Sequence, residues 1–542
     1  MRYFARRILL KLADRVVTSP LVRWTWTGPS NEEITGTLGE FRPTDRESVL
    51  EMMQGRYLLA SKLVDTNGVS PFSMDVVHDD WHDDLQTFAW LRHFRDARSE
   101  EERRFARTLA LDWIGREGRF EPISWSPAIC ARRVLNWLRH FNILTEGASM
   151  EQVAAIRRSL STQIQSLKLR SMLTTEPVEA LLSAVALAGV ALCSLNGESE
   201  LLPRLRRVHR LLDQQIDEDG LHRSRCAKLQ LQILVELITI RQVLLQQQQE
   251  EIAEELTQLM DSMHRALDAV SLGTGEPAYF NGTGQLPHDL VVAVQAQSPA
   301  RARATGVVGG YGRLISGQSI VVADSGQVPP PDYARTAHAS ALAFEFSHGR
   351  DLVVANCGPA PVGFPGDALL FRQGVAHSAP TINAMSAAAI PRQGPFAGRV
   401  IRIGAPAEVT ADEADLSLLL RTHGYESRFG VTLERRLTLL AEGKTLVGQD
   451  RLVPVSSRVS GACAIRFHLA SLAEVEERAD VVRLRIGSGA VWSFLWEGAE
   501  MRVEESIRQS AHFGFHRTRQ IVLDVLAEEA EEVSWIFTLE EG

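Results

Sequence analysis

The sequence contains few cysteines, and they form no pair that would define a site. The five cysteines lie far apart, and no Cys-x-x-Cys pair occurs. An odd number of widely spaced cysteines argues against a disulfide framework and against a zinc knuckle. We therefore expect most of the thiols to be buried as small apolar groups.

The sequence also lacks a long apolar run. No stretch is long and apolar enough for us to expect a membrane span. Residues 1–17 combine basic and apolar side chains, but Lys11, Asp14 and Arg15 interrupt the apolar part, and we expect no cleavable secretory signal. A short amphipathic helix, able to contact a membrane surface, is the better interpretation. On sequence alone we expect the protein in the cytoplasm.

Positive charge is in the minority. The formal net charge is −9, which argues against nucleic acid as a partner. An acidic glycan is not excluded, because a local arginine cluster can override the average. The chain also lacks a Gly-x-Gly-x-x-Gly before a helix, a phosphate-binding loop ending in Gly-Lys-Ser/Thr, and a His-Glu-x-x-His pair. These absences leave no indication of a nucleotide or zinc-protease site.

What the first half does contain is helical periodicity. Apolar residues recur at three- and four-residue steps, as in Val134, Trp137, Leu138 and Phe141. Short connections such as Asp219-Gly220 separate these segments. Successive helices with short loops predict antiparallel pairs, either a bundle or an α/α toroid. We place this helical domain at residues 46–270, after an amphipathic or extended segment at residues 1–45.

The second half has the pattern of an antiparallel β-sandwich. Residues 271–305 are rich in glycine and proline, and we interpret them as a linker. Beyond them, in residues 306–542, apolar and polar residues alternate, for example along residues 431–439, and Gly487-Ser488-Gly489 separates two β-rich runs. Many strands spaced by turns predict a sandwich. A chain of 542 residues is long enough for these two domains.

Three polar residues follow or precede strand-like segments of the second half. His338 comes just before the alternation Leu342, Phe344, Phe346, and Asn356 and His377 follow. A sandwich edge could bring His338, Asn356 and His377 into one cluster that binds a divalent cation, zinc or calcium, or a uronate. The alternative is that the histidines are hydrogen-bonded within the sandwich edge.

This order of residues resembles the C-terminal domain of the heparinase II/III family of polysaccharide lyases. The resemblance continues through Arg435-Arg436-Leu437, Gly448 to Leu452, Phe467-His468-Leu469 and Trp492-Ser493-Phe494. It implies an N-terminal α/α toroid, an incomplete helical barrel, followed by the β-sandwich. It also implies β-elimination on an acidic, uronate-containing polysaccharide in the cleft between the two, and often a location in the periplasm or cell envelope.

The helical half resembles the family's sugar-binding stretch at one place. Trp125-Ser126-Pro127 is followed by Arg132, Arg133 and Asn136. Tryptophan offers a flat face to a sugar ring, and arginine offers a planar fork to a carboxylate or sulfate. The alternative is that Trp137 belongs to the core and that Arg132 is a helix-surface charge.

The Asp219-Gly220 turn resembles a second element of the family's site. It is followed by His222, Arg223 and Arg225. β-Elimination needs a neutralised carboxylate, a base and an acid. The resemblance gives His222, His338 and Arg223 catalytic roles and Arg225 a substrate contact. The alternative is a polar loop between helices.

The sequence departs from the family's lyases at two points. The stretch Thr174 to Glu179 lacks the family's Asn-His pair, and Arg225 to Lys228 lacks the tyrosine expected after the turn. These departures favour a non-catalytic member that binds an acidic glycan in cell-envelope biology. A third hypothesis is a glycoside hydrolase, for which Glu176 and Glu179 are candidate carboxylates. The sequence leaves the oligomeric state open.

Overall fold

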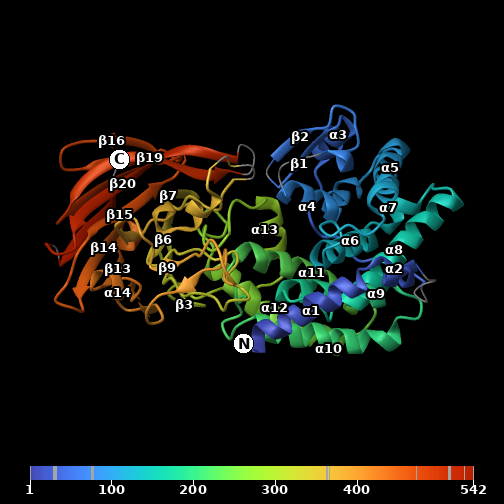
Figure 1. Ribbon diagram of the computed structural model, residues 1–542. Helices are drawn as coiled ribbons and strands as arrows, with labels where there is room; N and C mark the ends of the chain where they lie inside the picture. The colour runs from blue at the N-terminus through green and yellow to red at the C-terminus, as the bar shows by residue number, and fades with distance from the viewer. Residues whose placement is uncertain are drawn as a thin grey trace. The chain divides into compact units, whose positions relative to one another are not determined.

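The chain folds into two compact units. The computed structural model describes residues 2–27, 33–60, 62–74, 79–361, 364, 366–471, 473–510, 514–529 and 531–540. The first unit comprises Met1–Gln215 and Ile233–Met260, and the second comprises Ile216–Gln232 and Asp261–Gly542. The first is helical and the second consists mainly of antiparallel sheets (Figure 1), as the sequence predicts.

The helices of the first unit are set by local signals. Ser149 caps a 21-residue helix through a capping box with Gln152, and Pro127 and Pro177 occupy the first turns of two others. The helices within this unit are α1 (Arg2–Val17), α2 (Pro20–Arg23), α3 (Arg46–Met53), α4 (Asp79–Thr87), α5 (Glu100–Glu117), α6 (Pro127–Arg139), α7 (Phe141–Thr145), α8 (Met150–Arg170), α9 (Pro177–Cys193) and α10 (Glu198–Gln215). Helices α11 (Ala227–Gln246) and α12 (Glu250–Ala269) contribute to both units. A small hairpin joins β1 (Arg56–Leu59) to β2 (Lys62–Asp65).

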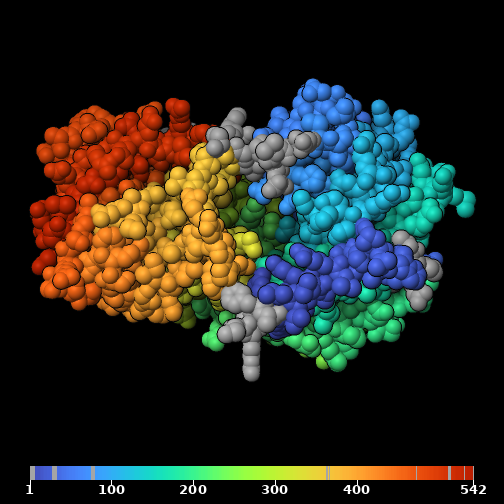
Figure 2. Space-filling model, in the orientation of Figure 1, coloured from blue at the N-terminus to red at the C-terminus, as the bar shows by residue number. Residues whose placement is uncertain are grey.

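The predicted N-terminal amphipathic helix is α1, and it leaves apolar side chains in solvent. Ile8, Leu9, Leu12 and Val16 are between 50% and 66% exposed. Figure 2 shows α1 lying on the surface of the helical unit. Two ion pairs hold it there, Arg7 with Glu176 at 2.5 Å and Asp14 with Arg170 at 2.7 Å.

One helix in the described part of the chain is long and apolar enough to cross a membrane. This is α11, and 67% of its apolar window is buried inside the structure. From the sequence we expect no such stretch. Because a buried core helix has the same composition, α11 is only a weak sign of a span.

In the described residues, the second unit contains two large sheets that enclose one apolar core. One sheet has the order β11-β12-β13-β14-β21-β18-β17-β16, and the other has β19-β20-β15-β7-β6-β5-β4-β3, with β8 paired to β15. The strands of the first sheet are β11 (Glu408–Asp412), β12 (Ser417–Thr422), β13 (Val431–Leu440), β14 (Thr445–Pro454), β16 (Glu474–Glu477), β17 (Val482–Arg485), β18 (Val491–Glu497) and β21 (Glu532–Leu539). Those of the second are β3 (Gly306–Val308), β4 (Tyr311–Ser316), β5 (Ser319–Asp324), β6 (Ala343–His348), β7 (Asp351–Ala355), β8 (Pro380–Ile382), β15 (Ala462–Leu469), β19 (Glu500–Ser510) and β20 (Gly514–Leu526). The period-two alternation points one face of each strand into this core.

A buried ion pair connects the sandwich core to the loop that carries His377. Arg435 binds Asp450 through two hydrogen bonds of 2.7 and 2.9 Å, and Trp535 donates to the same carboxylate at 2.8 Å. The guanidinium also donates to the backbone carbonyl of Ser378 at 2.9 Å. The loop is thereby fixed to the neighbouring strands β13 and β14.

The predicted linker contains a helix that the sequence analysis misses. Helix α13 (His288–Gln295) lies inside residues 271–305. Pro287 precedes its first turn, and Val291 and Val294 are buried. Only two residues of this short helix face the core, which is too few to give a periodic signal in a glycine-rich stretch.

Candidate functional site

The two histidines singled out in the second half lie against each other. His338 precedes β6, and His377 follows the short turn Gly374–Ala376. Nδ1 of His338 and Nε2 of His377 are 3.0 Å apart. The structure therefore brings these two predicted site residues together within the sandwich unit.

Hydrogen-bond partners determine which nitrogen of each ring carries the proton. The backbone carbonyl of Gln373 lies 2.8 Å from Nδ1 of His377 and can only accept. We therefore assign a proton to Nδ1 of His377, and its Nε2 accepts the Nδ1–H of His338. This leaves Nε2 of His338, a side chain that is 5% exposed, as a hydrogen-bond acceptor.

Both rings are neutral at pH 7. Burial lowers the pKa of His338 well below 6.5 and lowers that of His377 to about 4. Neighbouring positive charge at Arg372 adds to the effect on His338. A ring with so low a pKa is a weak general base, but it remains a good hydrogen-bond acceptor.

Asn356 lies next to this pair, but its side chain is already occupied. Its Oδ1 accepts the backbone N–H of Ser378 at 2.8 Å, and its Nδ2 donates to the carbonyl of Tyr279 at 3.4 Å. The buried carboxylate of Glu345 accepts the backbone N–H groups of Asn356 and Tyr279 at 2.7 and 3.0 Å. Asn356 thus connects the histidine loop to the segment that carries Tyr279.

The three predicted metal ligands do not fit a cation in this arrangement. A zinc or calcium ion needs ligand atoms that converge on one point. Here a proton lies between His338 and His377, and Oδ1 of Asn356 binds a backbone N–H. Among the described residues, no group of three or more His, Cys, Asp or Glu side chains is arranged to hold a metal. The alternative interpretation, a hydrogen-bonded pair in the sandwich edge, describes these histidines.

His222 is sealed inside the same unit. The turn before it needs Gly220, which has a φ of +85° and where a Cβ would lie 2.4 Å from the carbonyl oxygen of Ser262. The ring of His222 is fully buried, and its Nδ1 lies 2.8 Å from the hydroxyl of Ser224. Burial lowers its pKa to about 3. The predicted catalytic role of His222 therefore has no accessible base to support it.

Arg225 and Arg223 have opposite surroundings. Arg225 is buried and donates to Asp324 at 2.7 Å, to Gly309 at 2.8 Å and to Gln327 at 2.7 Å, while its guanidinium stacks 4.2 Å above the ring of Tyr311. All of these partners lie within the protein. The prediction that Arg225 contacts substrate is therefore wrong, and this side chain stabilises the fold. Arg223, by contrast, is exposed.

A third histidine of this region was missed as a site residue. His468 donates from Nε2 to the carbonyl of Val375 at 3.1 Å, so its Nδ1 accepts the hydroxyl of Ser506 at 2.7 Å. The thiol of Cys357 lies 3.6 Å from the same nitrogen. Burial lowers the pKa of His468 to about 3. Ser506 lies on β19, 38 residues away in the sequence. No local sequence pattern predicts the contact between His468 and Ser506.

Trp125 and Arg133 belong to the core of the helical unit. Both are fully buried. Arg133 lies 4.3 Å from the ring centre of Trp113 and 5.7 Å from that of Trp125, and it donates to the side chain of Gln163 at 2.9 Å. The prediction that Trp125 and Arg133 contact a sugar is therefore wrong, because Arg133 itself lies against the indole rings. Arg132 is partly exposed.

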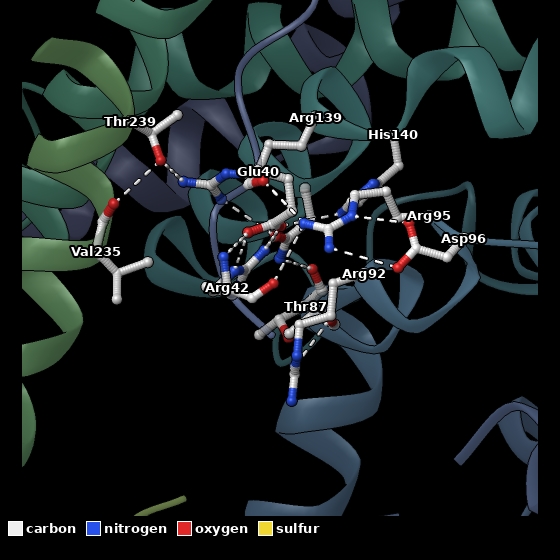
Figure 3. A network of polar contacts seen from close by, with 12 residues as sticks. Glu40, Arg42, Thr87, Arg92, Arg95, Asp96, Arg139, His140, Val235 and Thr239 are labelled. Carbon is white, nitrogen blue, oxygen red and sulfur yellow. Dashed lines mark hydrogen bonds and ion pairs between the residues drawn. The ribbon is translucent and has the colours of Figure 1, made fainter. Parts of the chain in front are cut away.

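Asn136 belongs to a buried charge network in the helical unit. Its Oδ1 accepts from Arg42 at 2.9 Å and from Arg139 at 3.2 Å, and its Nδ2 donates to the carbonyl of Thr87. Figure 3 shows Arg42 and His140 gathered near the carboxylate of Glu40. Because its side chain is bonded within this network, the prediction that Asn136 contacts a sugar is wrong.

Two carboxylates anchor this network. Glu40 binds Arg42 through two side-chain hydrogen bonds, and Glu236 binds Arg139. Burial acts to raise the pKa of Glu40, but hydrogen bonds and charge from Arg42 outweigh it and hold the pKa far below 4.5. The side chains of these four residues are at most 10% exposed. The sequence offers no period that links residue 40 to residue 236.

Comparison with known proteins identifies the second half directly. Residues 298–536 match the family described as "Heparinase II/III-like, C-terminal". Most of the sheet-rich unit is therefore a heparinase II/III-like C-terminal domain. The predicted fold class is confirmed by the crystal structure of heparinase III, which aligns with a TM-score of 0.73 at 12% identity and covers 100% of this chain and 90% of that one.

Two further proteins are similar to this chain, one in structure and one in sequence. A mutant of heparan sulfate lyase HepC from Pedobacter heparinus aligns with a TM-score of 0.60 at 12% identity, over 100% of this chain and 89% of that one. At such identities the likeness shows the fold alone. FtsZ-localized protein C from Caulobacter vibrioides (strain NA1000 / CB15N) is 29% identical in an alignment 483 residues long that covers 84% of this chain and 82% of that protein.

Proposed function

We propose that this chain is a non-catalytic heparinase II/III-like protein that localises with FtsZ. The observation that carries the proposal is that most of the predicted catalytic and substrate-binding side chains are buried and bonded within the fold, whereas Arg223 is exposed. His222 is fully buried, and Arg225 is bonded to Asp324 and two backbone carbonyls. Together with the missing tyrosine and Asn-His pair, this leaves no matched acid and base for β-elimination.

The proposed partner rests on the relative from Caulobacter vibrioides. That protein is named for its localisation with FtsZ, and its similarity extends through both units of the present chain. On this proposal the chain resides in the compartment that holds FtsZ. A heparinase-like fold would then serve as a binding scaffold, since a fold does not by itself carry an activity.

Imaging in the producing cell tests the partner. A fluorescent fusion of the full chain should coincide with labelled FtsZ and should disperse when FtsZ is depleted. Purified chain should also bind purified FtsZ. A fusion that keeps its position after FtsZ depletion, with no binding in solution, would contradict the proposal.

One observation favours a second candidate, a lyase acting on an acidic, uronate-containing polysaccharide. Nε2 of His338 is an acceptor on a side chain that keeps 5% exposure, and Arg223 is exposed in the same unit. A neutral imidazole and an arginine are groups that β-elimination uses. No step through a metal is included, because the three predicted ligands do not fit one.

Ultraviolet absorbance separates the two candidates. β-Elimination creates a conjugated, unsaturated uronate, so a lyase would raise the absorbance of a uronate polysaccharide. We expect no rise with wild-type protein across a panel that includes the cell's own acidic glycans. A rise that His338→Ala abolishes, and that Arg132→Ala leaves unchanged, would replace the scaffold by a lyase.

A further inference from the structure

The sandwich has an open side where one edge of each sheet borders a hollow. Strand β16 stands at the end of one sheet and β19 at the end of the other. The hollow has a volume of about 700 Å³ and is lined by Glu477, Arg478, Ala479, Trp496, Glu500 and Met501. Its lining thus comes from both edges and from the strand β18 that carries Trp496.

The outer edge of β19 carries main-chain groups that point away from its neighbour. β19 pairs with β20 over its whole length without a register shift. At its far end, the N–H of Gln509 donates to the carbonyl of Cys357 at 2.8 Å, so this residue faces away from β20. Because direction alternates along an antiparallel strand, Met501 and Val503 face the same open way. Among the described residues, no backbone group bonds to their outward N–H groups.

Side chains at this edge alternate between an apolar and a polar face. Met501 and Val503 pack against the sandwich core, as does the partly buried Trp496. Arg502 and Glu504 lie on the other face, where Arg502 pairs with Asp524 at 2.5 Å. A strand added here would present every second side chain to Trp496 and Met501 and the others to solvent.

The surroundings of the hollow are acidic. The segment from residue 474 to 480 holds four acidic residues, of which Glu476 pairs with Arg478 at 2.7 Å and Glu474 with Arg485 at 3.7 Å. Glu477 and Glu500 are exposed on the lining itself. An acidic rim attracts positive charge.

We propose that the outer edge of β19 accepts an extended basic peptide as an added strand. Main-chain hydrogen bonds to Met501 and Val503 supply the pairing, and the hollow over Trp496 takes the apolar side chains of an alternating sequence. Lysine or arginine at the intervening positions meets the acidic rim. The proposal does not depend on FtsZ, and it names a site outside the histidine cluster.

Binding of a designed peptide tests this edge. The probe is a labelled peptide of alternating lysine and valine, followed by fluorescence anisotropy with the full chain. Val503→Pro removes one outward N–H without touching the β19–β20 ladder, and we expect it to weaken binding by about five- to ten-fold, as for one lost hydrogen bond. Val503→Thr keeps the N–H and should bind like wild type.

Charge and folding have their own controls. The double variant Glu477→Gln/Glu500→Gln should weaken binding and reduce its dependence on salt. If Val503→Pro does not fold, a peptide N-methylated at alternate residues tests the wild-type chain instead, and it should not bind. Absence of binding, equal affinity for a glutamate–valine peptide, or equal affinity of Val503→Pro would overturn the proposal. A concentration-dependent dimer that Val503→Pro abolishes would assign the edge to a second copy and would likewise overturn it.

Discussion

Two buried clusters, one in each unit, stabilise their polar side chains in opposite ways. In the helical unit, the cluster consists of charged pairs, Glu40 with Arg42 and Glu236 with Arg139. In the sandwich unit, the buried histidines are neutral, and a chain of hydrogen bonds ends at a single acceptor nitrogen of His338. Such ion pairs stabilise the fold, whereas the neutral histidine pair leaves one acceptor nitrogen, Nε2 of His338, that can bind a ligand.

The physical reason for the difference lies in desolvation. A buried carboxylate loses several kcal/mol of hydration and must recover it from a cation nearby. An imidazole can instead give up its proton and stay neutral. The cluster around Glu40 and Glu236 therefore needs an arginine at each carboxylate, while the histidine pair needs only the carbonyl oxygen of Gln373 to orient the ring of His377.

The largest loss of stability should follow from breaking the charged network of the helical unit. Arg139→Met leaves Glu236 without its arginine, and we expect a loss of about 3–5 kcal/mol in the free energy of unfolding. Urea denaturation measures this loss. The matched control is Arg116→Met, which breaks a surface pair with Asp112 and should cost less than about 1 kcal/mol. Equal losses in the two variants would refute the contrast.

The neutral network should respond to acid. The pKa of His377 is about 4 in the folded chain and 6.5 for a free side chain, so the unfolded chain binds more protons between these values. Stability therefore falls as pH drops from 6.5 towards 4 and is unaffected by this group above 6.5. At pH 5, His377 should account for about 2 kcal/mol of the loss. Thermal unfolding of wild type and His377→Gln across this range measures it, and parallel pH profiles would count against the assignment.

A smaller effect should distinguish the two arginines after the Asp219-Gly220 turn. Arg223 is exposed, and Arg223→Ala should change the free energy of unfolding by no more than about 0.5 kcal/mol. Arg225→Ala, the matched control, strands the buried Asp324 and should cost several times more. Denaturant unfolding of both variants gives the comparison. A large loss in Arg223→Ala would show that this side chain also holds the fold.

The smallest effect should come from a chelator. Because His338, His377 and Asn356 do not converge on one point, removal of divalent cations should leave the melting temperature unchanged to within about 1 °C. Melting with EDTA, and with zinc or calcium added back, measures this. A fall of several degrees that zinc restores would mean that the histidines rearrange around a metal.

The sequence predicted the structure correctly wherever a periodic pattern of apolar residues forms one buried face of a helix or strand. The period near 3.6 in the first half and the alternation in the second predict the helical unit and the sandwich, and the order of His338, Asn356 and His377 predicts their clustering. It was a poor guide to exposure. Trp125, Arg133 and Asn136 have the composition of a sugar site and are buried instead.

The sequence by itself determined most of the helices and strands, their order and the resemblance to the heparinase II/III family, because these depend on local periodicity and on residues near each other in the chain. Only the tertiary structure decided which polar groups are buried and bonded within the protein and which can be reached by a ligand. That Arg225 meets Asp324 and that His468 meets Ser506 depends on contacts between residues 99 and 38 positions apart. Burial, and with it the pKa of each histidine, follows from that packing, and no local pattern records it.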